Sequence, residues 1–261
     1  MKNLKNTMNN EFFIWEGVYN NFYEAKAFAD GFGFSGETYN LRAYDAAKEC
    51  LDAINSNLPI PFFHKQRSVI LPPIVAMMMN SKSKLNIFDF GGGLGIGYMT
   101  LKESISDLDE KINYTIMELS FICKQGKELH NGNINFVEDF SNLKEFNLVH
   151  SSSAIQYIDD WKGLISKLCS FNASNILMSD VFAGDFKSYV TLQNYYGNKI
   201  PHWFFSINEF IGVFEDNGYF LDMKSCVSAK RLDIDDLLPM TNFSEQYRLN
   251  YTSHMLFKKK N

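Results

Sequence analysis

Short apolar runs alternate with longer amphipathic stretches from residue 85 onward. The runs are rich in Ile, Val, Leu and Phe, which is typical of strands buried on both faces of a parallel sheet. The stretches between them carry apolar residues at three- and four-residue spacing, as helices that pack on a sheet do. The sequence therefore predicts strands at 85–90, 112–119, 134–139, 146–153 and 174–180, with helices at 96–108, 120–130 and 159–169 between them.

The chain after this series predicts one more helix and two more strands. In the segment 206–221, Ser206 is the expected N-cap, Glu209 is its capping-box partner and Gly218 is the C-terminal stop. A strand, a polar excursion and a returning strand at 251–257 follow. We therefore expect an α/β fold whose sheet is mostly parallel and has an antiparallel edge strand.

The first 84 residues do not follow the βαβ rhythm. The segments 14–29 and 39–54 have helical spacing, and the proline-bearing segment 58–79 leads into a further helix. We expect residues 1–84 to form a helical cap, or lid, over a domain of residues 85–261.

Composition narrows the class of protein. A chain of 261 residues with 46% apolar residues can bury the core of one enlarged domain. Its net charge of −5 and pI near 5.6 argue against nucleic acid as a partner. No apolar run is long enough for a bilayer and no signal core follows the polar start, so we expect no membrane and a cytoplasmic location. The scattered cysteines, Cys50, Cys123, Cys169 and Cys226, are expected to be reduced thiols.

A glycine-rich turn, DFGGGLG (89–95), follows the first predicted strand and ends where a helix begins. Glycines accept positive φ angles and let a ligand approach the backbone closely. The free N–H groups at a helix start favour a carboxylate or a phosphate. The turn therefore predicts a ligand site.

The spacing of the glycines in this turn distinguishes among three known classes of ligand-binding loop. A nicotinamide-binding turn usually reads GxGxxG near the start of a domain, and a Walker A loop needs a following Gly-Lys-Ser/Thr. DFGGGLG instead resembles motif I of class I S-adenosylmethionine-dependent methyltransferases, in which the acidic residue and the glycine backbone hold the methionine part of the cofactor. The resemblance implies a Rossmann-like methyltransferase sheet and cofactor contacts from Asp89, Gly91, Gly93 and Gly95.

The ends of the following strands carry further candidates, because parallel strands present their carboxyl ends to a ligand. Glu118, followed by Leu119, can accept hydrogen bonds from two ribose hydroxyls. The resemblance places Asp139 near the adenine amino group and Phe140 over the purine face. The resemblance also implies that Ser152 and Ser153 face the sulfonium. We expect Tyr19 and Arg67 to close over the cofactor, with Arg67 at its carboxylate.

The flanking blocks narrow the resemblance. Taken with the glycine turn, IWEGVYNNFYEA, HSSSAIQYIDDW and TLQNYYGNKIPHWFFSINEF resemble a family of bacterial methyltransferases associated with surface-glycan gene clusters for capsule, O-antigen or flagellin glycan. This implies O-methylation of a sugar hydroxyl, on a nucleotide-linked hexose or heptose used for capsule or lipopolysaccharide. Asn147 stands where many methyltransferases have Asp, and Gln156 where many have His or Glu, so no catalytic role carries over directly at either position.

Methyl transfer requires in-line alignment of the acceptor and removal of its proton. His202 is the first candidate for general base, because imidazole accepts a proton near neutral pH. Asp180 is its rival, and Gln156 completes the catalytic candidates. We expect no metal, because a helix N-terminus explains the acids Asp159 and Asp160; Mg²⁺-assisted transfer stays an alternative.

Other functions stay open at this point. They are N- or carboxyl-methylation of another small molecule, a non-catalytic cofactor-binding partner of a glycan enzyme, and NAD-dependent oxidation. Product analysis, binding without turnover, and nicotinamide binding respectively distinguish them. The sequence leaves the acceptor and the oligomeric state undetermined, with a homo-oligomer among the allowed assemblies.

Overall fold

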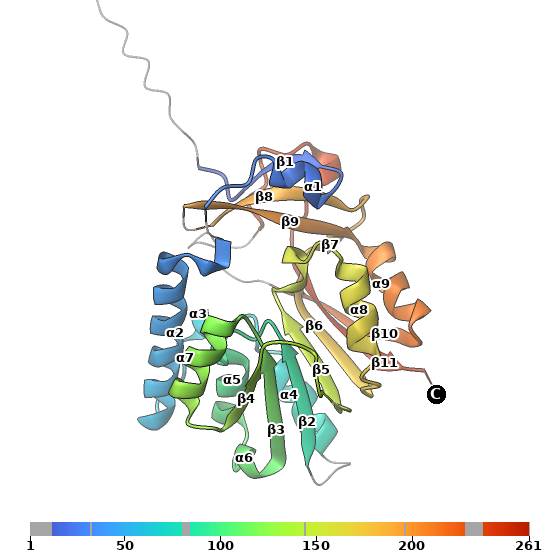
Figure 1. The fold of residues 1–261 in the computed structure, drawn as a ribbon. Coiled ribbons are helices and arrows are strands. Elements are labelled where there is room, and N and C mark those ends of the chain that lie inside the picture. The colour runs from blue at the N-terminus through green and yellow to red at the C-terminus, as the bar shows by residue number, and fades with distance from the viewer. Residues whose placement is uncertain are drawn as a thin grey trace, which may run out of the picture.

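The computed structural model describes residues 12–31, 33–79, 84–143, 145–195, 197–227 and 237–260. Within them, a seven-stranded sheet has the order β10-β11-β6-β5-β2-β3-β4 (Figure 1). The strands are β2 (Leu85–Phe90), β3 (Ile112–Met117), β4 (Ile134–Val137), β5 (Leu148–Ser152), β6 (Asn175–Val181), β10 (Tyr219–Val227) and β11 (Thr252–Lys259).

This sheet confirms the predicted fold class. Strands β2 to β6 are parallel, and β11 runs antiparallel to both of its neighbours, β6 and β10. The antiparallel strand lies one place in from the edge, which β10 forms. The central strand β2 pairs with β3 on one side and with β5 on the other, so the chain reverses its direction of winding at β2. Ligands of open α/β sheets bind at such a switch point.

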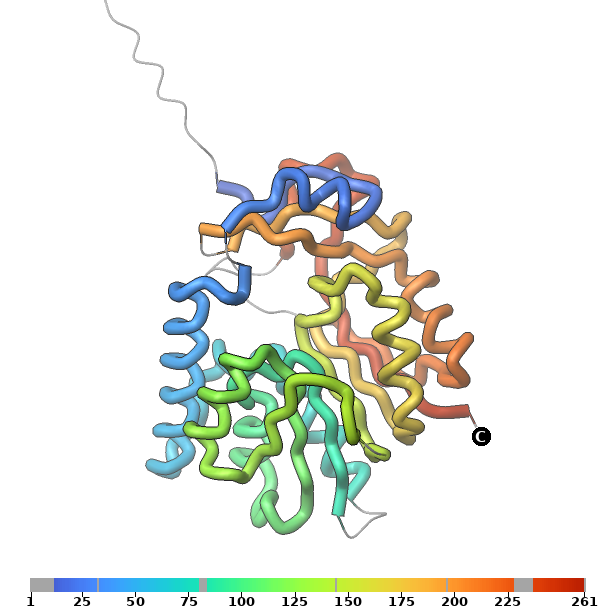
Figure 2. Tube along the Cα trace, in the orientation of Figure 1, coloured from blue at the N-terminus to red at the C-terminus, as the bar shows by residue number. Residues whose placement is uncertain are grey.

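Helices cover both faces of the sheet, because side chains along each strand alternate between the faces. Ile87 joins a core shared with α2 (Glu37–Asn55), α4 (Leu71–Met79), α5 (Ile96–Ser104) and α7 (Ser120–His130). Phe88 joins the opposite core with α8 (Trp161–Cys169) and α9 (Ile207–Asp216). Figure 2 shows the blue-to-green helices on one side and the yellow-to-orange helices on the other. Shorter helices are α1 (Phe22–Lys26), α3 (Phe62–Lys65), α6 (Leu108–Lys111) and the 3-10 turns η1 (Gly33–Ser35), η2 (Ile155–Tyr157) and η3 (Glu245–Tyr247).

A second sheet lies beyond the carboxyl ends of the parallel strands (Figure 1). Its order is β1 (Trp15–Tyr19), β8 (Tyr189–Tyr195), β9 (Asn198–Ser206) and β7 (Ala183–Gly184). The prediction of one helix over 14–29 is therefore wrong in its first part, because pairing with β8 draws β1 into the sheet and only α1 is helical. After β6, strands β8 and β9 form a hairpin. We call this second sheet, with α1 and η1, the roof. The division at residues 84 and 85 stays a prediction.

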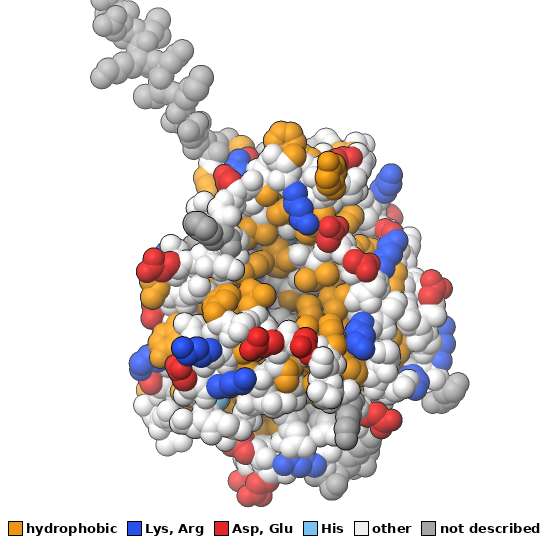
Figure 3. Space-filling model, in the orientation of Figure 1, with side chains coloured by type: hydrophobic (Ala, Val, Ile, Leu, Met, Phe, Trp, Pro, Cys, Tyr) orange, Lys and Arg blue, Asp and Glu red, His pale blue; other side chains and the backbone are white. Residues whose placement is uncertain are grey.

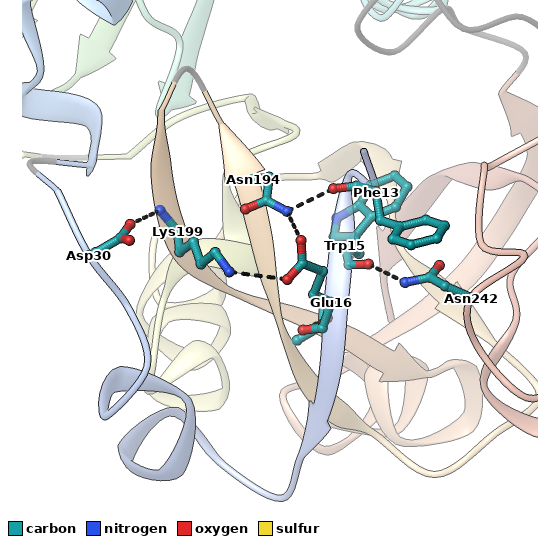
Figure 4. A network of polar contacts seen from close by, with 8 residues as sticks. Phe13, Trp15, Glu16, Asp30, Asn194, Lys199 and Asn242 are labelled. Atoms are coloured by element: carbon teal, nitrogen blue, oxygen red, sulfur yellow. Dashed lines mark hydrogen bonds and ion pairs between the residues drawn. The ribbon is translucent and has the colours of Figure 1, made fainter. Parts of the chain in front are cut away.

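Polar contacts hold β1 in the roof (Figure 4). The Glu16 carboxylate lies 3.1 Å from Lys199 Nζ of β9 and also accepts a hydrogen bond from Asn194 of β8. Asn242, near the C-terminal end of the chain, donates to the Trp15 carbonyl oxygen at 2.7 Å. The N-terminal strand is thus attached to two segments that lie far away in sequence. In the part of the chain that is described, no helix is long and apolar enough to cross a membrane.

An ion pair with a buried carboxylate joins the segment after α3 to the end of β6. Arg67 Nε lies 3.1 Å from Asp180 Oδ2, and Thr252 of β11 donates to Asp180 Oδ1 at 2.5 Å. Asp180 has no exposed surface, whereas the Arg67 side chain is 40% exposed. The pair therefore holds the N-terminal third of the chain to the carboxyl end of the parallel sheet.

We predict that Arg67→Met lowers the free energy of unfolding by about 3 kcal/mol, because it leaves the Asp180 carboxylate buried without its counter-charge. Urea denaturation followed by circular dichroism measures the loss. The control is Lys48→Met, which removes the exposed Lys48–Asp52 pair and costs at most about 0.5 kcal/mol. Equal losses in the two variants would contradict a structural role for the buried pair.

Candidate functional site

The glycine turn occupies the carboxyl end of β2 in left-handed conformations. Gly91, Gly93 and Gly95 have φ angles of +68°, +56° and +85°. A Cβ on Gly91 would lie 2.5 Å from Ala154 Cβ, and one on Gly95 would lie 2.8 Å from Ile134 Cδ1. Space above Gly93 is open, with nothing within 4 Å of an added Cβ. The turn therefore needs glycine for its conformation and for its packing.

A cavity of about 580 Å³ lies between the turn and the roof, a usual size for a small-molecule site. Figure 3 shows the hollow lined with hydrophobic side chains, with acidic side chains near its rim. Its glycine-turn end is formed by Gly91, Met117, Glu118, Leu119, Glu138 and Ser153. Its roof end is formed by Phe22, Phe34, Tyr39, Tyr157, Ile200 and Pro201.

Glu118 is fixed to the turn by two backbone hydrogen bonds. Its Oε1 accepts from the Gly93 N–H at 3.0 Å, and its Oε2 accepts from the Leu119 N–H at 2.9 Å. Burial raises the pKa of Glu118 above that of an exposed carboxyl, and the two N–H donors oppose this change. A preorganised carboxylate thus faces the cavity beside the backbone of the turn.

The ends of β4 and β5 carry the other predicted cofactor residues. Ser153 lines the cavity with a strained φ of +54°, directly after half-buried Ser152 at the end of β5. Asp139 is exposed and accepts a bond from the Ser141 N–H at 2.6 Å, whereas its neighbour Glu138 lines the cavity. Phe140 is half-buried and stacks on Phe90 with ring centroids 6.3 Å apart. The contact of Asp139 with the adenine amino group stays a prediction, and spacing alone does not say which of two adjacent acids points inward.

Asp89 lies beneath the turn and does not line the cavity. It is 1% exposed; Tyr114 donates to its Oδ2 at 2.7 Å, and its Oδ1 lies 2.9 Å from His150 Nδ1. Arg67 faces Asp180, as described above, and Tyr19 packs its ring against Phe28 with centroids 5.6 Å apart. Direct cofactor contacts from Asp89, Arg67 and Tyr19 stay predictions.

The three catalytic candidates are completely buried. His202, Asp180 and Gln156 have no exposed surface and are not part of the cavity lining. The His202 ring packs edge-on behind Tyr157, with centroids 5.2 Å apart. Gln156 donates from Nε2 to Ser153 Oγ at 3.1 Å. Because these three side chains lie behind the cavity lining, their positions favour supporting the lining residues over touching an acceptor. Their catalytic roles stay predictions.

The roof end contains residues that were not among the predicted catalytic or cofactor-binding residues. Phe34 of η1 packs edge-on against Tyr157 at 4.7 Å and against Tyr39 of α2 at 5.2 Å between centroids. Beside them, Lys26 Nζ lies 3.4 Å from Asp159 Oδ2, and both of these residues line the cavity. The sequence block AIQYIDD contains Tyr157 and Asp159, and its pattern indicated Asp159 only as an acid at a helix N-terminus or as a metal ligand. Among the described residues, no group of three His, Cys, Asp or Glu side chains is arranged to hold a metal ion.

We predict that Gly95→Ala is more destabilising than Gly132→Ala. Both residues have positive φ, +85° and +89°, which costs about 1–2 kcal/mol for any other residue. Only Gly95 is also crowded, with Ile134 and His130 within 3.0 Å of the added Cβ, which costs about 1–3 kcal/mol more. Urea unfolding of the two variants measures the difference, and equal losses would refute tight packing at the turn.

Comparison with known proteins supports the fold. No family model matches the sequence, and no curated protein matches it. Among solved structures, the chain is similar to the 1,6-didemethyltoxoflavin N1-methyltransferase of Burkholderia thailandensis, with a TM-score of 0.50, 11% identity and coverage of 84% of this chain and 90% of that one. It is also similar to an S-adenosylmethionine-dependent methyltransferase from Clostridium acetobutylicum, with a TM-score of 0.50, 13% identity and coverage of 86% and 100%. The chain has the Rossmann-like fold of S-adenosylmethionine-dependent methyltransferases.

Proposed function

We propose that this protein is an S-adenosylmethionine-dependent methyltransferase acting on a small molecule. The observation that carries the proposal is the Glu118 carboxylate, which is bound to the Gly93 N–H at the switch point of the sheet and faces the cavity. A carboxylate in this place suits a ribose diol, and the methyltransferase fold supplies the frame. S-adenosylhomocysteine is the expected product.

The residues at the glycine-turn end fit this cofactor. The open space above Gly93 and the first turn of α5 suit the methionine part, because the N–H groups at a helix N-terminus favour a carboxylate. Glu118 suits the ribose, and Glu138 suits an adenine amino group, since a carboxylate accepts from both. Ser153 and Ala154 then lie toward the reacting end. When bound, the cofactor supplies an activated methyl group.

The acceptor in our proposal is a hydroxyl of a sugar ring, on a nucleotide-linked hexose or heptose of a surface-glycan pathway in the cytoplasm. Support comes from the resemblance of the sequence and from the flat faces of Phe34, Tyr39 and Tyr157, which suit the apolar face of a ring. Lys26 is the only cation among the described lining residues, and it is paired with Asp159. The ring would therefore enter the cavity while a phosphate group stays at its mouth.

Proton removal belongs to the roof end in this proposal. As the acceptor oxygen bonds to the methyl carbon, the electron pair of the S–CH₃ bond returns to sulfur and the hydroxyl proton must leave. Asp159 is the carboxylate on that side of the cavity, and we assign the proton to it. Tyr157, whose hydroxyl donates to Gln193 Oε1 at 2.6 Å, holds the acceptor in place, with His202 packed behind its ring.

We predict that Glu118→Ala weakens S-adenosylhomocysteine binding about 10- to 100-fold. The variant loses the carboxylate that would accept hydrogen bonds from the two ribose hydroxyls and that holds the Gly93 N–H. Isothermal titration calorimetry of the folded variants measures the change. Glu128→Ala, which removes an exposed acid from the same region of sequence, is the control and should bind like wild type. Unchanged affinity in Glu118→Ala would overturn the assignment of the ribose site.

The raised pKa of Glu118 predicts a pH dependence of cofactor affinity. The ionised carboxylate accepts both ribose hydroxyls, so binding is strongest above its pKa and weakens as the pH falls through it. Because burial raises this pKa, the loss begins at a higher pH than an exposed Glu would give. Titrations of wild type and Glu118→Gln over a pH series test this, and a parallel pH dependence in both proteins would show that another group is responsible.

A further inference from the structure

A row of buried polar side chains crosses the central strands beneath the glycine turn. Asp89 of β2 lies between Tyr114 of β3 and His150 of β5, and all three are at most 2% exposed. Tyr114 donates to one carboxylate oxygen at 2.7 Å, and His150 Nδ1 lies 2.9 Å from the other. His150 Nε2 lies 3.3 Å from Ser179 Oγ of β6. The row thus joins four neighbouring strands at the switch point.

The Asp89 carboxylate touches the turn from below. An added Cβ on Gly92 would lie 2.6 Å from Asp89 Oδ2, and one on Gly97, in the first turn of α5, would lie 3.3 Å from it. A carboxylate beside the first turn of a helix is also stabilised by the helix dipole. The carboxylate therefore packs directly against Gly92 and the start of α5.

Stability alone does not account for these residues. Burying a carboxylate and an imidazole costs desolvation energy, and an apolar set of similar volume often serves a core equally well. Here both oxygens of Asp89 are engaged by side chains from the two flanking strands, which fixes the carboxylate in one orientation. Such a fixed support is what a backbone turn needs to present its N–H groups in one geometry.

We propose that His150 is a positioning residue for cofactor binding: it fixes Asp89, and Asp89 fixes the glycine turn that receives the cofactor. This inference rests on the function proposed above. His150 does not line the cavity, so its effect on the ligand passes through Asp89 and the backbone of residues 91–95. Tyr114 acts on the other oxygen of the same carboxylate.

The test compares His150→Leu with His150→Gln, whose amide can donate to Asp89. S-adenosylhomocysteine affinity is measured by calorimetry on folded protein, and backbone amide exchange is followed at residues 91–95. We expect His150→Leu to weaken binding about tenfold or more and to speed exchange at the Gly95 N–H, which is bonded to Gly92 O at 3.1 Å. His150→Gln should recover most of the affinity and most of the protection of the Gly95 N–H from exchange. His64→Leu, whose ring contacts Glu49 outside the row, should change neither.

The outcomes separate this inference from the proposed function. A folded His150→Leu protein with wild-type affinity and wild-type exchange at residues 91–95 overturns it, even if its stability falls. If His150→Leu does not fold, Tyr114→Phe removes one hydroxyl from the same carboxylate and carries the same expectation in affinity and exchange. If wild type itself does not bind S-adenosylhomocysteine, the proposed function fails, while amide exchange at the turn still decides whether His150 positions it.

Discussion

The bond between the Gly93 N–H and the Glu118 carboxylate is the contact on which the site depends. It joins the turn after β2 to the end of β3, so two neighbouring strands present one surface to a ligand. The three glycines of the turn take left-handed conformations, and at Gly93 no protein atom covers the backbone. The sheet order then places the β5 end on the other side, with Ala154 packed where a side chain at Gly91 would lie.

The roof covers this surface and so turns it into a cavity. A Rossmann-like sheet alone presents a shallow edge, whereas β1, β8 and β9 stand across it and place Ile200 and Pro201 over the turn. The two ends of the resulting cavity differ in chemistry. The glycine-turn end offers backbone and carboxylates, and the roof end offers aromatic faces with one ion pair. This division suits a polar cofactor beside a ring-shaped acceptor.

The sequence predicted the parts that depend on local pattern. Buried parallel strands appear as continuous apolar runs, and the turn DFGGGLG carries its own conformational requirement, so the sheet and the fold class were correct. The roof was missed because β1 forms through partners far along the chain, as between Thr191 and Glu16, 175 residues apart. The residue type also did not show where a side chain points. Asp180 and His202 both have the chemistry of a base, but Asp180 contacts Arg67 and His202 packs among aromatic rings.

Titration of the wild-type protein with S-adenosylhomocysteine and with NAD in one buffer tests the central claim most directly. The account predicts a single site that binds S-adenosylhomocysteine and no measurable binding of NAD, because the turn lacks the GxGxxG spacing of nicotinamide enzymes. A preference for NAD, or no binding of either compound to folded protein, would contradict it.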